Sequence, residues 1–124
     1  MLLVSLSVAP SEAADNSESL RLVRVVSGLR NPVFAVPAPS RLPGRLYVVE
    51  QSGVIRIVDR GHVLSQPFLD LHRQVQAGGL RGMFSLAFHP DYLRNGRFFV
   101  NYIGRDGDIY VTEFRSVEAA NSSA

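Results

Sequence analysis

A chain of 124 residues is at most one domain, and its 46% apolar and 19% charged residues are typical of a globular protein and not of a disordered one. All thirteen basic residues are arginines without a cluster, and the net charge is only +2, which argues against a nucleic-acid-binding surface. The absence of cysteine excludes disulfides, thiolate metal sites and a cysteine nucleophile, and no apolar run is long enough to predict a membrane span.

The first twenty residues have the character of a truncated export signal followed by a polar linker. Met1–Pro10 is apolar, and Ser11–Ala14 offers small residues where a signal peptidase could cut, but a positively charged start is missing. A disordered apolar tail is the alternative. Export would place the mature protein in the periplasm or outside the cell. The predicted organisation is therefore residues 1–20 as leader and linker, 21–116 as the folded part, and 117–124 as a tail.

Short strands separated by turn residues follow along the rest of the chain. The strands predicted from β-forming side chains are 20–29, 33–36, 45–50, 54–58, 62–64, 67–71, 83–88, 97–103 and 108–115. Glycine and proline interrupt them every 8–12 residues or so, which predicts an all-β sandwich, barrel or propeller. No amphipathic helix of useful length is expected, and residues 70–76 should form one or two helical turns at most.

The stretch Gly78–Tyr92 has the most distinctive sequence in the chain. It opens with glycines, which allow backbone conformations and close approaches that a side chain would block. Met83–Phe88 has the length and bulk of a strand buried on both faces, and Pro90 ends it because proline has no N–H for a ladder. Asn95–Gly96 then predicts a tight turn with positive φ before the next strand.

Two hairpins in the sequence are similar to each other. The strand pair 45–50 and 54–58 and the strand pair 97–103 and 108–114 each have a glycine-containing turn between an aromatic strand and an alternating one. They are separated by about fifty residues, the length of a long propeller blade. The repeat favours a propeller over a sandwich.

These segments resemble the glucose/sorbosone dehydrogenases, the soluble pyrroloquinoline-quinone (PQQ)-dependent sugar dehydrogenases and their relatives. The resemblance spans Leu22 to Arg115, and the matching motifs are Arg45–Ile57, Pro67–Leu71, Gly82–Tyr92, Asn95–Gly96 and Phe98–Tyr102. It implies a six-bladed β-propeller of which this chain holds about two four-stranded antiparallel blades, the second without its last strand. Such an open, incomplete propeller is expected to self-associate through its unpaired strand edges.

The resemblance also implies an activity, the oxidation of a sugar hydroxyl with hydride transfer to the quinone, assisted by calcium. In the family a histidine acts as general base while the cofactor carries the redox chemistry; that histidine is not part of this sequence. This chain is therefore expected to be inactive by itself. The alternative is a non-enzymatic propeller that serves as a binding or interaction module.

Leu80 and Arg81 bear on that choice. The family commonly has glutamate or glutamine directly before the position of Arg81, and the glutamine contacts the quinone. Leu80 offers neither donor nor acceptor, which predicts weakened quinone binding. Arg81 is the candidate cofactor-binding residue, because it could face an anionic ligand, and a solvated loop arginine is the alternative.

No catalytic residue and no metal ligand is predicted. His89 has the context of a structural histidine at a corner, and His62 and His72 lack metal-ligand spacing. The Asp106–Asp108 segment resembles a calcium loop only superficially and favours a hairpin turn. The remaining candidates are two isolated carboxylates and a formal glycosylation sequon, namely Asp70, Asp91 and Asn121.

Overall fold

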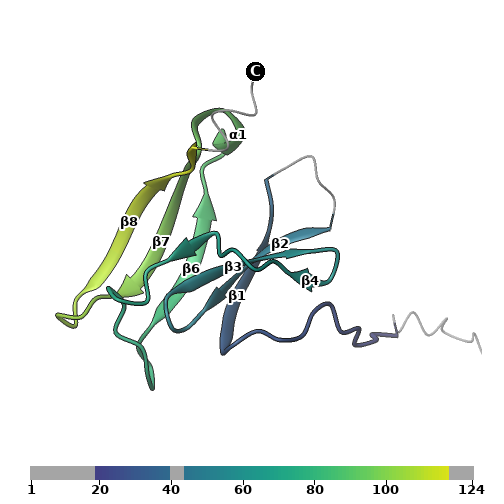
Figure 1. Cartoon of the computed structure of the whole chain (residues 1–124), viewed down its shortest axis with the longest axis horizontal. Helices are drawn as coiled ribbons and strands as arrows, with labels where there is room; N and C mark the ends of the chain where they lie inside the picture. Colours follow the sequence, from purple (N-terminus) through teal and green to yellow (C-terminus); the bar gives the residue numbers. More distant parts are fainter. Residues whose placement is uncertain (1–18, 40–43, 118–124) are drawn as a thin grey trace, which may run out of the picture.

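The computed structural model describes residues 19–39 and 44–117, which form two antiparallel β-sheets and one short helix (Figure 1). The predicted leader up to residue 18, the tail beyond residue 117 and the sequon at Asn121 lie outside the described residues. Among the described residues, no helix is both long and apolar enough to cross a bilayer. The all-β prediction is confirmed.

The first sheet has five strands, and the two shortest, β4 and β5, pair with different ends of the same strand, β3. Its order is β1–β2–β3–β4, and β5 pairs with β3 at the end that β4 leaves open. Glu50 pairs with Val54 to close the β2–β3 hairpin, and Gly53 supplies the positive φ of 103° that its turn requires. The strands are β1 (Pro32–Pro37), β2 (Arg45–Glu50), β3 (Val54–Asp59), β4 (His62–Val63) and β5 (Leu69–Asp70).

The second sheet has three strands in order β6–β7–β8 within the described residues, as expected for a sector without its last strand. These strands are β6 (Met83–Phe88), β7 (Arg97–Ile103) and β8 (Ile109–Arg115), and the helix α1 (Tyr92–Asn95) joins the first two. The β2–β3 and β7–β8 hairpins occupy the second and third positions of their sheets. The repeat predicted from the sequence is therefore a structural repeat.

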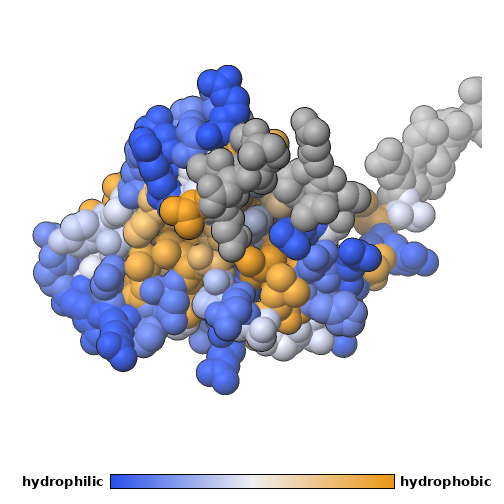
Figure 2. All heavy atoms as spheres, turned by 45° about the horizontal axis from the view of Figure 1, so that its top comes forward, coloured by the Kyte–Doolittle hydropathy of each residue, from blue (hydrophilic) through white to orange (hydrophobic). Residues whose placement is uncertain are grey.

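The core lies between the two sheets, where β6 packs against β1 and β2. Aromatic rings from both sheets meet there: the centroid of Phe68 is 4.6 Å from that of Tyr47 and 4.8 Å from that of Phe98. Phe88 lies 5.1 Å from Tyr47 at an interplanar angle of 67°, an edge-to-face geometry that the ring quadrupoles favour. The space-filling view shows apolar surface in the middle of one face, with hydrophilic surface on both sides (Figure 2).

The strand predicted over residues 20–29 is wrong. This segment is an irregular coil that belongs to neither sheet (Figure 1), and the side chains of Leu20 and Leu22 are fully exposed. Its leucines and valines have β propensity, but a strand also needs a neighbour to accept its ladder hydrogen bonds. None of the described residues forms a ladder with it.

Two further expectations near β6 need correction. The strand is not buried on both faces: Met83 and Leu86 are buried, whereas Phe84 is 37% exposed, because only one face packs on the first sheet. The reversal at Asn95–Gly96 is the end of helix α1, not a two-residue turn. Only Gly96 has a positive φ there, 66°, and its N–H donates to the Tyr92 carbonyl at 2.7 Å, which closes the helix.

We predict that copies of the chain associate through the outer edge of β8. Among residues 19–39 and 44–117, no strand pairs with the outer side of β8, so its backbone groups on that side can pair with another chain. Its side chains Ile109 and Val111 are 73% and 70% exposed. We expect light scattering to find species larger than a monomer, and Val111→Lys to raise the monomer fraction severalfold, because a lysine on an edge opposes pairing. Leu22→Lys, at a side chain that is also exposed but lies outside both sheets, is the control. A clean monomer with cooperative thermal unfolding would contradict the prediction.

Candidate functional site

The turns of the two long hairpins and the loop 71–82 meet at one edge of the molecule. The Gln76 N–H donates to the Ile103 carbonyl at 2.9 Å, which fixes the loop to the end of β7. The Met83 N–H donates to the Gln51 carbonyl at 3.0 Å, which fixes it to the turn after β2. Both sheets therefore contribute to this edge, which we call the loop edge; helix α1 lies at the opposite end of β6 (Figure 1).

Gln51 organises the glycine-rich part of the loop. Its side-chain Nε2 donates to the carbonyls of Gly79 at 2.8 Å and Arg81 at 2.9 Å. Gly78 and Arg81 exchange backbone hydrogen bonds of 3.2 and 3.0 Å. Gly82 has a φ of +148°, and a Cβ placed on it would lie 2.5 Å from the Gln51 carbonyl oxygen. The close backbone approach predicted for these glycines is therefore present at Gly82, which lies against the Gln51 backbone.

Leu80 and Arg81 form the tip of this glycine loop. Leu80 is 94% exposed, and Arg81 is also exposed. Within residues 19–39 and 44–117, the Arg81 guanidinium makes no ion pair. The tip therefore presents an uncompensated cation and an apolar side chain on a backbone that four hydrogen bonds hold in place.

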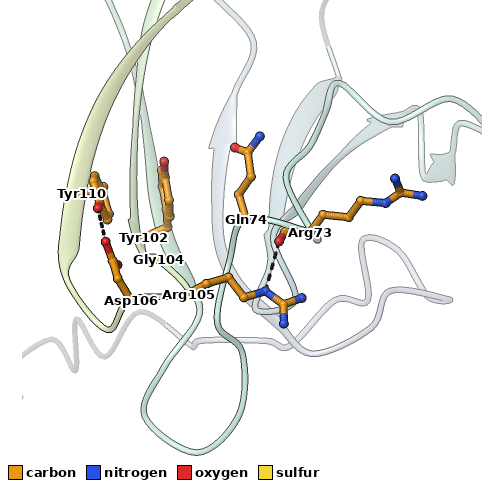
Figure 3. Close-up of a pocket in the computed structure, with 7 residues that line it drawn as sticks. All are labelled: Arg73, Gln74, Tyr102, Gly104, Arg105, Asp106 and Tyr110. Atoms are coloured by element: carbon orange, nitrogen blue, oxygen red, sulfur yellow. Dashed lines mark hydrogen bonds between the residues drawn. The ribbon is translucent and has the colours of Figure 1, made fainter.

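Beside the glycine loop, at the turn between β7 and β8, lies a hollow of about 440 Å³ (Figure 3). The Tyr102 and Tyr110 rings on one side of it are stacked, with centroids 5.4 Å apart and an interplanar angle of 17°. The lining residues are Arg73, Gln74, Tyr102, Gly104, Arg105, Asp106 and Tyr110. Arg81 and the three histidines are not among them.

Asp106 is held ionised at the rim of the hollow. It accepts hydrogen bonds from the Tyr110 hydroxyl and, at 3.1 Å, from the Asp108 N–H. The hydrogen bond from Tyr110 lowers the pKa of Asp106 and raises the pKa of Tyr110, because it stabilises the carboxylate and the protonated phenol together. The Asp106–Asp108 segment is the hairpin turn that the sequence favours, and no three Asp, Glu or His side chains of the described residues come together as metal ligands.

The remaining sequence candidates lie apart from the hollow. His89 accepts from the Asp91 N–H at 3.0 Å and contacts the Asn95 amide at 2.9 Å, the corner role predicted for it. His72 pairs with Asp70 at 2.5 Å, and this contact lowers the pKa of Asp70. The third histidine, on β4, is exposed.

Sequence reasoning missed the tyrosine pair, Arg105 and Gln51. The tyrosines had a usable signal, because positions 102 and 110 lie equally far from the centre of the β7–β8 turn and therefore pair across the hairpin. Gln51 had none, since its hydrogen bonds span 28 and 30 residues.

Three-dimensional comparison relates the two sheets to sugar dehydrogenases of the propeller fold. The PQQ-bound aldose sugar dehydrogenase of Streptomyces coelicolor superposes with a TM-score of 0.65 and 22% identity, over 78% of this chain and 28% of that one. An oxidoreductase (glucose dehydrogenase) of Thermus thermophilus gives a TM-score of 0.67 and 24% identity, over 82% of this chain and 29% of that one. The chain thus has the fold of two sectors of such a propeller.

Among curated proteins, human Hedgehog-interacting protein is 42% identical over 83 residues, which cover 63% of this chain and 12% of that protein. The HIPL2 protein of Arabidopsis thaliana is 36% identical over 67 residues, 51% of this chain and 9% of its own length. The chain therefore spans about a tenth of the curated relatives it matches. No family model matches the sequence.

Proposed function

We propose that this chain is the N-terminal part of an exported, quinone-dependent sugar dehydrogenase and is inactive by itself. The observation that carries the proposal is the glycine loop, which Gln51 holds rigid at the loop edge with Arg81 at its tip. The likeness in fold to aldose and glucose dehydrogenases supports the proposal, as does the share of those chains that this one spans, 28% and 29%. The apolar first residues support export.

The residues of the loop fit one part of the quinone. PQQ carries carboxylates, and the Arg81 guanidinium can pair with one of them; Leu80 can provide no polar contact. The described residues do not form a calcium site. When bound, the quinone would accept hydride from the sugar carbon. The task of this chain's residues is then to bind and orient: Arg81 by its charge, and Gln51 by fixing the backbone that presents it.

Quinone titration of the chain tests the proposal. We expect a saturable change in the PQQ absorbance and no sugar oxidation by this chain alone. Arg81→Gln should weaken binding about tenfold or more, because a charge-assisted hydrogen bond contributes roughly 1.5–3 kcal/mol. Arg94→Gln removes an exposed arginine from α1, at the far end of β6, and should leave the titration unchanged. No absorbance change, or equal binding by Arg81→Gln, would reject this role.

A protein-binding module is the second candidate, and Leu80 favours it. Leu80 is 94% exposed at the tip of the glycine loop, and burying this apolar side chain against a partner would remove it from water. The 42% identity to a protein named for its interaction with Hedgehog supports the same role. The two candidates separate on one result: a correctly folded chain that fails to bind the quinone would favour the binding module.

A further inference from the structure

The outer side of β8 presents backbone groups at every second residue. On its inner side the strand pairs with β7 without a shift in register. The Ser116 N–H donates to the Gly96 carbonyl at 2.8 Å, and the Gly104 N–H donates to the Asp108 carbonyl at 2.9 Å. The even-numbered residues of β8 therefore direct their N–H and C=O groups to β7, and the odd-numbered residues direct theirs outwards. Those that face outwards are Ile109, Val111, Glu113 and Arg115.

The side chains of β8 also alternate between two faces of the sheet. Those of the odd-numbered residues are exposed, apolar at the start of the strand and charged at its end. Those of the even-numbered residues face the core: Tyr110 stacks on Tyr102, and Phe114 stacks on Phe98 with centroids 5.6 Å apart. A strand that pairs with β8 thus meets an aromatic ring near each end on one face. In Figure 1, β8 lies at the margin of the molecule, where an added strand has room.

A second copy of β8, antiparallel to the first, matches this edge when the two-fold axis passes through Thr112. All seven residues of the strand then have a partner, and the outward backbone groups of the two copies face each other. Tyr110 of each copy lies opposite Phe114 of the other, and Thr112 lies opposite Thr112, both of which are favourable cross-strand pairs.

The neighbouring registers are less favourable. An axis at Glu113 would set the two glutamates directly against each other, and like charges in that position are destabilising. An axis at Val111 would set Arg115 of one copy against Gly107 of the other, which lies in the turn before β8. The register centred on Thr112 avoids both faults.

We propose that the chain forms a closed dimer in which β8 pairs with β8 of a second copy about Thr112. The two three-stranded sheets join into one sheet, and neither copy keeps a free β8 edge. The contact uses the same surface on both copies, so it ends at two chains instead of growing into a filament. It goes beyond the proposed function, because it uses no residue of the glycine loop and requires neither quinone nor metal.

Sedimentation equilibrium of the unmodified chain tests the closed form. We expect the average mass to rise with protein concentration and to level off at twice 13.6 kDa, because each copy has one β8 edge to give. A mass that continues to rise, or that stays at the monomer value throughout, would overturn the proposal. This measurement needs no variant and is independent of any effect of a substitution on folding.

Cysteine cross-linking tests the register, because the chain has no cysteine of its own. Backbone groups of Thr112 point away from the second copy, and opposed residues of that kind have Cα atoms about 4.5 Å apart, within the range of a disulfide. We expect mild oxidation to link most Thr112→Cys chains in pairs and reduction to separate them. Circular dichroism verifies that the variant is folded.

Val111→Cys is the matched control on the same strand. Val111 is 70% exposed, but in the proposed register it lies opposite Glu113 of the second copy and not opposite its own counterpart. Its thiol should therefore link at least fivefold more slowly than that of Thr112→Cys, although it is freely accessible. Equal rates for the two variants would indicate random collision, and faster linking by Val111→Cys would indicate another register. Either result would overturn the proposed pairing.

Discussion

Replacing Gly82 by alanine is expected to destabilise the chain by about 3–5 kcal/mol. The new Cβ would lie 2.5 Å from the Gln51 carbonyl oxygen and 2.6 Å from the Gln51 Cγ. That carbonyl accepts the Met83 N–H, which starts β6, so it cannot move away without loosening the strand. The φ of +148° adds strain because side chains other than glycine rarely adopt it. The loss should appear as a lower urea midpoint in circular dichroism, at one fixed protein concentration.

Gly78→Ala is the matched control in the same loop. Gly78 also has a positive φ, +124°, but a Cβ there would meet nothing within 4 Å. Only the backbone strain then remains, about 1–2 kcal/mol. Equal losses for the two variants would show that the contact between Gly82 and Gln51 is not what fixes the glycine loop to the first sheet.

Truncating Phe98 to alanine is expected to cost about 3–5 kcal/mol of unfolding free energy. Phe98 is 3% exposed and lies where the sheets meet, with ring centroids 4.8 Å from Phe68 and 5.6 Å from Phe114. Alanine would leave a cavity between the two sheets. The neighbouring rings could fill it only by giving up their present contacts. Thermal and urea unfolding of the variant, at the protein concentration used for the unmodified chain, measure the loss.

Phe99→Ala tests whether the effect comes from the core or from the strand. Phe99 is the next residue of β7 and points to the other face, where it is half-buried under the Arg97 guanidinium at 5.8 Å. Its loss should cost about 1 kcal/mol, the value of a surface packing and cation–π contact. A larger loss for Phe99 than for Phe98 would mean that the two faces of the second sheet have been assigned the wrong way round.

Local sequence patterns predict the turns of the candidate site but not the contacts between its segments. The close backbone approach at the glycines before β6 and the hairpin turn at Asp106 were predicted from the sequence, because the conformation of a turn depends on residues within four positions of each other. The hollow at the β7–β8 turn was not predicted from the sequence. Its Arg105 is fixed by a carbonyl 32 residues away, and the glycine loop by a side chain 28 and 30 residues away. Such contacts depend on how two sheets pack, which no local pattern contains.

The sequence by itself determined where most of the strands lie along the chain. β2, β6 and β7 begin and end where the sequence predicts, because alternating or continuous apolar runs between glycine, proline and charged turns leave little freedom for their ends. The fifty-residue repeat of hairpins likewise predicted two successive sectors. The two hairpins, β2–β3 and β7–β8, are the second and third strands of their sheets.

Only the tertiary structure decided which β-forming segments find a partner and which faces are buried. Residues 20–29 have β propensity and remain outside both sheets, whereas Leu69–Asp70 pairs although only two residues long. The apolar run of β6 is covered on one face and partly open on the other. The physical reason is that β structure is stabilised between strands: propensity makes a strand possible, and a neighbour with free hydrogen-bonding groups makes it form.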